Sequence, residues 1–88
     1  MELDDDDRPF ALKWKRTFPE VENDFTARDP AHPAAFARVY VQPSHPDPTH
    51  RWFWTASGTH QIGLGNEPTV REAARKAEEA YLAWRDKQ

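Results

Sequence analysis

The stretch RWFWTASG, residues 51–58, is the most informative part of the sequence, because it sets three aromatic side chains close together and ends at a glycine. Apolar and polar side chains alternate along it, which predicts a β-strand over residues 51–57. Successive side chains of a strand point to opposite faces. One face would carry Trp52, Trp54 and Ala56, and the other would carry Arg51, Phe53, Thr55 and Ser57. The fold therefore depends on which face is buried, and the function on what the other face contacts.

Alternating patterns around this stretch predict further strands. Residues 36–42, FARVYVQ, give the clearest one, with Ala37, Val39 and Val41 on one face and Phe36, Arg38, Tyr40 and Gln42 on the other. Residues 10–18, FALKWKRTF, predict a half-buried strand whose apolar face holds Phe10, Leu12, Trp14 and Phe18. Shorter strands are expected through Phe25 and in HQIGLG, residues 60–65, where glycines allow a bulge or a close backbone approach.

Residues 69 onward predict an amphipathic helix that covers the tryptophan face of the sheet. Thr69 and Glu72 have the spacing of a capping box, which marks a helix start. The apolar stripe that follows is mostly alanine, and small residues on a helix leave room for large rings opposite them. The expected surfaces in contact are Val70, Ala74, Ala77, Tyr81 and Trp84 on the helix and Ala37, Val39, Val41, Trp52 and Trp54 on the sheet.

Length and charge predict one small domain behind an acidic segment. The chain has 88 residues, which favours a single domain. The predicted fold class is α+β, an antiparallel sheet of three to four strands packed on one C-terminal helix, within residues 9–88. Residues 2–7 hold five of the 15 acids and no base, so residues 1–8 are expected to form a flexible acidic tail. The remaining residues carry 12 bases and 10 acids, so the body is nearly neutral.

Several classes of function are excluded by what the sequence lacks. The chain has no cysteine, which excludes disulfides and thiolate metal sites. The spacing of His45, Asp47 and His50 matches no zinc motif, and neither serine lies in a nucleophile motif. We therefore predict no enzyme activity, no metal and no cofactor. The acidic N-terminus lacks signal-peptide features, and no apolar run approaches the roughly 20 residues of a membrane span, so a cytoplasmic protein is expected.

The face that carries Phe53 has three alternative roles. By alternation it also carries Phe36, Arg38, Tyr40 and Arg51. The N-terminal strand or residues 20–35 would cover it in the first alternative. It would be a protein interface in the second, including the interface of a homodimer, because large exposed apolar patches mark partner surfaces. It would stack bases and hold phosphates in the third.

A resemblance to known proteins adds an expectation about function. The pattern Trp52-Phe53-Trp54, a glycine at 63 or 65, Thr69, Glu72-Ala73, Ala77 and Tyr81 resembles small bacterial and phage or prophage proteins over residues 36–84. Those proteins carry W-x-W on a strand and T-x-x-E-A at the start of a C-terminal helix. Some small acidic phage proteins inhibit host defence, including anti-CRISPR proteins. The order of elements is also similar to the DNA-binding domain of plant ethylene-response factors and the arm-binding domain of tyrosine integrases, which use a basic sheet face.

The first functional hypothesis follows from the phage resemblance. It implies a non-enzymatic protein-binding module in a bacterial host that occludes the basic nucleic-acid-binding surface of a defence complex of the CRISPR-Cas kind. Acidic groups would replace phosphates on that surface, and two aromatic side chains would anchor the contact. The residues assigned to this role are Asp4, Asp5, Asp6, Asp7, Glu78 and Glu79, with Tyr40 and Phe53 as anchors.

The alternative hypothesis is a small DNA- or RNA-binding domain. Its aromatic and basic sheet face would use Arg38, Arg51, Tyr40 and Phe53, with further phosphate contacts from Lys13, Lys15 and Arg16. The acidic tail would then compete with nucleic acid for the basic face, so removal of residues 1–8 would tighten binding. A third hypothesis is a dimerising protein without a ligand.

Overall fold

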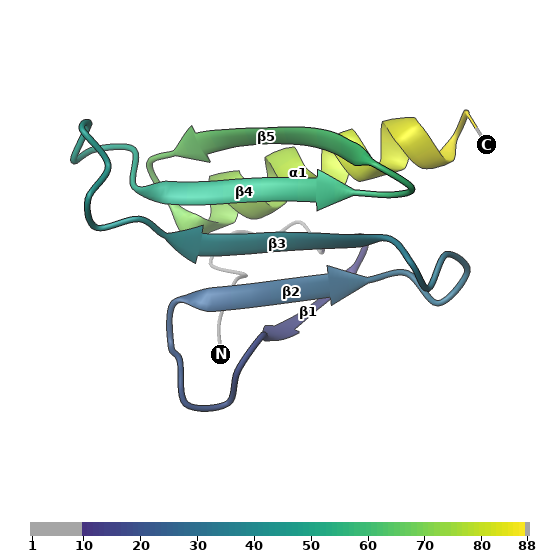
Figure 1. Ribbon diagram of the computed structural model, residues 1–88, viewed down its shortest axis with the longest axis horizontal. Helices are drawn as coiled ribbons and strands as arrows, with labels where there is room; N and C mark the ends of the chain where they lie inside the picture. Colours follow the sequence, from purple (N-terminus) through teal and green to yellow (C-terminus); the bar gives the residue numbers. More distant parts are fainter. Residues whose placement is uncertain (1–9, 88) are drawn as a thin grey trace.

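The computed structural model describes residues 10–87, which form one antiparallel sheet and one C-terminal helix (Figure 1). The strands are β1 (Lys13–Arg16), β2 (Asp24–Arg28), β3 (Phe36–Val41), β4 (Trp52–Ser57) and β5 (Gln61–Glu67), and the helix is α1 (Val70–Arg85). Each strand pairs with the next one along the chain, so the sheet order is β1-β2-β3-β4-β5. The predicted α+β class is confirmed, with five strands in place of three to four. The predicted acidic tail, residues 1–8, lies outside the described residues.

The register explains how the two faces differ. Val39 pairs with Phe25 on one side and with Trp54 on the other, so these three side chains share a face. Val39 is fully buried, and Trp54 is only 9% exposed. Helix α1 contacts β3, β4 and β5. The tryptophan face of the sheet is therefore the one under the helix, as the alternating pattern predicts.

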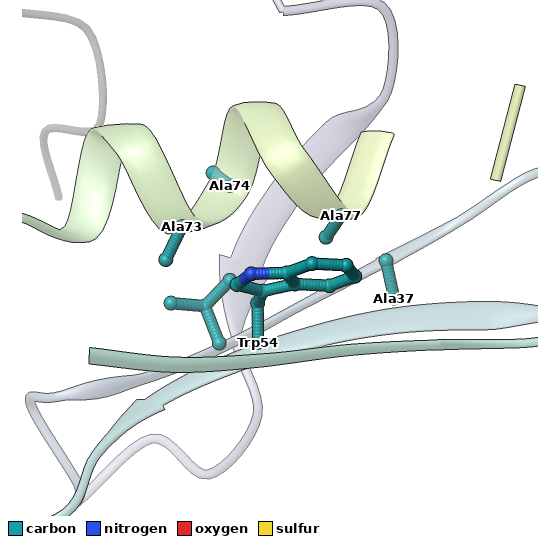
Figure 2. Packing of buried hydrophobic residues seen from close by; sticks show 6 residues of the cluster. Ala37, Trp54, Ala73, Ala74 and Ala77 are labelled. Carbon is teal, nitrogen blue, oxygen red and sulfur yellow. The ribbon is translucent and has the colours of Figure 1, made fainter. Parts of the chain in front are cut away.

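The Trp54 indole fills the space between the sheet and α1. Figure 2 shows the ring lying flat beneath the alanines of the helix. Ala73, Ala74 and Ala77 are fully buried against it, because their small side chains let the helix approach the sheet closely. The indole Nε1 donates a hydrogen bond of 3.2 Å to a carboxylate oxygen of Glu67. This part of the core thus consists of one large ring with small residues around it, and a second buried cluster is formed by Tyr81, Ala35 and Ala56.

Two glycines of β5 make room for this ring. Gly65 pairs with Trp54 and Gly63 with Ala56 across the strands. A Cβ atom at Gly65 would lie 2.7 Å from the indole Nε1, whereas a Cβ atom at Gly63 would lie 3.3 Å from the ring carbons. The absence of a side chain at residue 65 therefore lets the indole lie directly over the backbone of β5.

We expect Gly65→Ala to lower the free energy of unfolding by about 1–3 kcal/mol, the usual cost of forcing extra atoms into a packed core. No glycine has a positive φ, so the cost comes from the clash with Trp54 and not from the backbone. Gly63→Ala is the matched control and should cost less, since its Cβ is farther from the ring. Urea denaturation followed by circular dichroism measures both. An unchanged transition for Gly65→Ala would contradict the packing described.

Strand β1 lies at the edge of the sheet. The aromatic side chains of Trp14 and of Phe10, which precedes the strand, lie on the side of the helix. Glu78 of α1 is only 4% exposed, and its carboxylate accepts hydrogen bonds from the backbone N–H groups of Ala11 (3.2 Å) and Leu12 (2.9 Å). It also accepts one from the Trp14 indole at 2.9 Å. Phe10 packs edge-on to Trp14 on the same side. The alternative in which these rings cover the Phe53 face is therefore wrong, because Glu78 binds this segment on the helix side.

Asp29, which follows β2, binds the C-terminal half of α1. Its carboxylate accepts hydrogen bonds from the Ala31 backbone N–H (2.9 Å), the Tyr81 hydroxyl (2.8 Å) and the Arg85 guanidinium (3.0 Å). These bonds, with that of Ala31 the strongest influence, lower the pKa of Asp29 from 3.8 to about 2. Burial and the neighbouring Asp29 raise the pKa of Tyr81 to about 12. The ionised carboxylate and the neutral phenol are thus the forms that the fold favours.

We expect Asp29 to make the fold sensitive to acid. Because the folded state lowers the pKa of Asp29, its contribution to stability is present above about pH 4 and is lost as the pH falls toward 2. The difference in Tm between the wild type and Asp29→Asn should therefore shrink as the pH is lowered from 6 to 2. Thermal unfolding at a series of pH values checks this. A difference in Tm that stays constant over this range would contradict a stabilising role for the ionised carboxylate.

Candidate functional site

The face of the sheet opposite α1 is uncovered within residues 10–87, and Figure 1 looks onto it, with the helix behind β4 and β5. We call this surface the open face. Cross-strand pairing aligns Thr26, Arg38, Thr55 and Leu64 in one row, and Asp24, Tyr40, Phe53 and Asn66 in the next. The open face also includes Lys13, Lys15, Arg28 and Phe36 by the same alternation. Leu64 is 56% exposed, as expected of a side chain with nothing above it.

Arg38, Tyr40 and Phe53 form a contiguous platform on β3 and β4. The Tyr40 and Phe53 rings lie side by side with their centroids 5.3 Å apart. The Arg38 guanidinium lies over the Tyr40 ring at 4.7 Å from its centroid, a cation–π distance. We call these three side chains the Tyr40 platform. The two rings are tilted by 56° to each other, and each offers a polarisable face beside the guanidinium to a ligand with a π-system.

Asp24 holds the guanidinium of this platform in place. The Arg38 Nε donates to one Asp24 oxygen at 2.9 Å and the Nη2 to the other at 2.5 Å, which is the bidentate geometry of strong ion pairs. The Thr17 hydroxyl donates to the same carboxylate at 2.7 Å. Burial alone would raise the pKa of Asp24, but the hydrogen bonds from Arg38 and Thr17 outweigh it and lower that pKa. The pair therefore stays charged at neutral pH and fixes the orientation of the platform.

A second aromatic ring, with a guanidinium beside it, lies at the other end of β3. The Arg28 guanidinium is 5.5 Å from the centroid of the Phe36 ring. We call these two side chains the Phe36 pair. Phe36 and Tyr40 are four residues apart on one strand, so the two groups lie about 13 Å from each other. The open face thus presents two sites where a planar group could stack.

The charge of the open face is mainly positive. Its strands carry Lys13, Lys15, Arg28 and Arg38, while Asp24 is the single carboxylate among the described strand residues on this face. Arg38 neutralises Asp24, and no carboxylate within residues 10–87 forms an ion pair with the other three cations. Lys13, Lys15 and Arg28 are exposed to solvent. Three cationic groups are therefore left to attract an anionic ligand.

The structure brings together most of the residues that the sequence assigned to nucleic-acid binding. Lys13, Lys15 and Arg38 lie on the open face with Tyr40 and Phe53. Arg51 is exposed directly before β4, next to that face along the chain. Arg16 has the opposite alternation, pairs with Phe25 and donates to the Pro19 carbonyl, so it does not join the face. Sequence reasoning missed Arg28, although the alternation of Asp24, Thr26 and Arg28 with apolar residues was a signal for it.

The residues assigned to the protein-inhibitor hypothesis do not share one described surface. Glu78 is buried and occupied by the N-terminal segment, so its carboxylate is unavailable to a partner. Glu79 is exposed on α1, on the other side of the sheet from Tyr40 and Phe53. Asp4, Asp5, Asp6 and Asp7 lie outside the described residues.

Two further observations concern metal binding and membrane crossing by the described residues. No three histidine, aspartate or glutamate side chains within residues 10–87 are grouped closely enough to bind a metal ion. His45 and His50 instead contact Asp47 within their own loop. Helix α1, over the same range, lacks the length and apolar character that crossing a membrane requires.

No protein family matches the chain, and neither curated proteins nor solved structures give a match. The resemblance to phage proteins and to anti-CRISPR inhibitors therefore stays a prediction.

Proposed function

We propose that this protein is a small non-enzymatic domain that binds nucleic acid through the open face. The observation that carries the proposal is the composition of that face, which joins aromatic rings to cations on an uncovered sheet. The single carboxylate among its described strand residues is neutralised by Arg38. Nucleic acid offers both of the matching groups, phosphates for the cations and planar bases for the rings.

Lys13, Lys15 and Arg28 would supply the phosphate contacts. They lie on β1 and β2, where Lys13 pairs with Arg28 across the two strands, so their charges are close together. Cations that neutralise phosphates release condensed counterions, which drives binding and makes it sensitive to salt. A net charge of −3 for the chain does not oppose this, because the positive charge is local and five acids lie in residues 2–7.

The protein-inhibitor hypothesis has less support from the geometry. Its anchors, Tyr40 and Phe53, lie beside Arg38, and the carboxylate next to Tyr40, that of Asp24, is already paired with Arg38. A contact with a basic partner surface would need carboxylates free to bind that surface. The two described acids assigned to it are buried or lie across the molecule. A face with this charge suits an anionic ligand better than a basic one.

The test compares two double variants with the same change in charge. Lys13→Ala/Lys15→Ala removes two cations from the open face, and Lys76→Ala/Lys87→Ala removes two exposed cations from α1 and the residues after it. Binding is measured by fluorescence anisotropy with labelled oligonucleotides at several salt concentrations.

We expect the wild type to bind and its affinity to fall steeply with salt. The open-face variant should bind more weakly, with the slope of log K against log salt reduced by about 1 for each lysine removed. The α1 variant should behave like the wild type. Absence of binding at low salt, or an equal loss in both variants, would contradict the proposal.

A further inference from the structure

The open face carries most of its cations and its rings on different strands. Its cations without an acidic partner in the described residues (Lys13, Lys15 and Arg28, the cationic strip) lie on β1 and β2, and its rings (Phe36, Tyr40 and Phe53, the aromatic strip) lie on β3 and β4. Arg28 connects the two strips, because its guanidinium is 5.5 Å from the centroid of the Phe36 ring. Neighbouring strands are about 4.8 Å apart, so the middle of the cationic strip is about 10 Å from the middle of the aromatic strip. Beyond the rings, β5 offers the uncharged side chains of Leu64 and Asn66. A ligand that fits this face must therefore carry its charge along one side and its planar groups along the other.

The rings are placed to meet the flat surfaces of bases. The Tyr40 platform and the Phe36 pair lie along β3, so both follow the same direction as the cationic strip beside them. Stacking on a side chain requires a base whose face is free, and paired bases in a duplex expose only their edges. The aromatic strip can therefore stack on unpaired bases but not on the paired bases of a duplex.

The preformed order of the Tyr40 platform supports the same conclusion. Arg38 is held by two hydrogen bonds to Asp24, and Asp24 by the hydroxyl of Thr17. A side chain bound in this way is a poor candidate for reaching into a groove to read base edges, because it would have to leave its ion pair. It can serve as a stacking surface without moving.

Resting on the proposed function, we infer that the open face binds single-stranded nucleic acid, with the phosphates along β1 and β2 and unpaired bases stacked on the Tyr40 platform and the Phe36 pair. The strand of nucleic acid then runs along the β-strands and does not cross them. The preference for single strands comes from stacking, and the cations add affinity that does not depend on sequence.

The experiment uses three labelled DNA probes of equal length: oligodeoxythymidine, a duplex, and a backbone that carries abasic sites in place of bases. The wild type is compared with Tyr40→Leu/Phe53→Leu and, independently, with Phe36→Leu. Leu64→Ala is the control, since it alters the same face outside both ring groups. Circular dichroism verifies that each variant is folded.

We expect the single strand to bind at least about tenfold more tightly than the duplex or the abasic backbone, since stacking contributes about that factor for each base. The ring variants should lose this preference while their affinity for the abasic backbone is unchanged. Equal binding of duplex and single strand would overturn the inference and leave nucleic-acid binding intact. An equal loss of affinity for the abasic backbone would overturn the role of stacking. Absence of binding to every probe would overturn both the inference and the proposed function.

Discussion

Replacing Trp54 by alanine is expected to lower the free energy of unfolding by about 3–5 kcal/mol, the usual cost of removing a large buried ring. Small domains have total stabilities near the lower end of 5–15 kcal/mol, so this loss would leave a large fraction of molecules unfolded. The effect is large because the residues around the ring are mainly alanines and glycines, which cannot move in to fill the space. Thermal unfolding followed by circular dichroism measures the loss.

Two variants give the comparison for this prediction. Trp54→Phe keeps much of the ring and should lose less stability. Phe53→Ala removes a half-buried ring from the open face, where solvent already reaches it, and should also lose less. If Trp54→Ala and Phe53→Ala lost equal stability, the indole would not be the centre of the core.

Replacing Glu78 by alanine is expected to have the second-largest effect on stability, about 3 kcal/mol. The change leaves three donors without their acceptor, two backbone N–H groups and the Trp14 indole, and each unsatisfied buried donor costs about 1–3 kcal/mol, less where solvent can reach it. The amides of Ala11 and Leu12 should also exchange faster with solvent. Urea denaturation and hydrogen exchange measure these two effects.

Glu79 offers a matched control for Glu78. It has the same side chain one residue later on α1, but it is exposed, so Glu79→Ala should change stability by no more than about 0.5 kcal/mol. A similar small loss for Glu78→Ala would contradict the role described for its carboxylate. Because β1 carries Lys13 and Lys15, loss of Glu78 should also weaken nucleic-acid binding by loosening this strand.

The class of fold could be predicted because its signals are local. The alternation of apolar and polar residues in β3 and β4 indicated which face of the sheet is buried. Thr69 marked the start of the helix, where its hydroxyl accepts a hydrogen bond from the Glu72 N–H at 3.1 Å. The number of strands was harder to predict. β2 has only two apolar residues, and β5 contains two glycines, which are rare within strands. These strands form because their neighbours pair with them, and pairing is not visible in a short window of sequence.

Glu78 shows why a polar residue can be misplaced by sequence reasoning. It was assigned to contact with a basic partner, which requires an exposed side chain. It lies, however, four residues after Ala74 and three before Tyr81, which is the spacing of the buried stripe. The donors that make its burial favourable come from residues 66 and 67 positions away. Only the folded structure shows that they exist.

The candidate site, like the fold, could be predicted only in part. Alternation alone placed Arg38, Tyr40 and Phe53 on one face. Arg28 was missed because only the first part of β2 was recognised as a strand. The pairing of Arg38 with Asp24 depends on the register between β2 and β3, which the sequence pattern does not contain.

A nuclear magnetic resonance titration of the labelled protein with unlabelled oligodeoxythymidine shows whether the open face contacts nucleic acid. The four tryptophans provide an internal reference, since Trp14, Trp52 and Trp54 share the face of the sheet under α1 and Trp84 belongs to the helix itself. We predict that the signals of Phe36, Tyr40 and Phe53 shift in proportion to the bound fraction, while the indole N–H signals stay in place. Shifts confined to α1 and the indoles, or none at all at low salt, would contradict binding of nucleic acid through the open face.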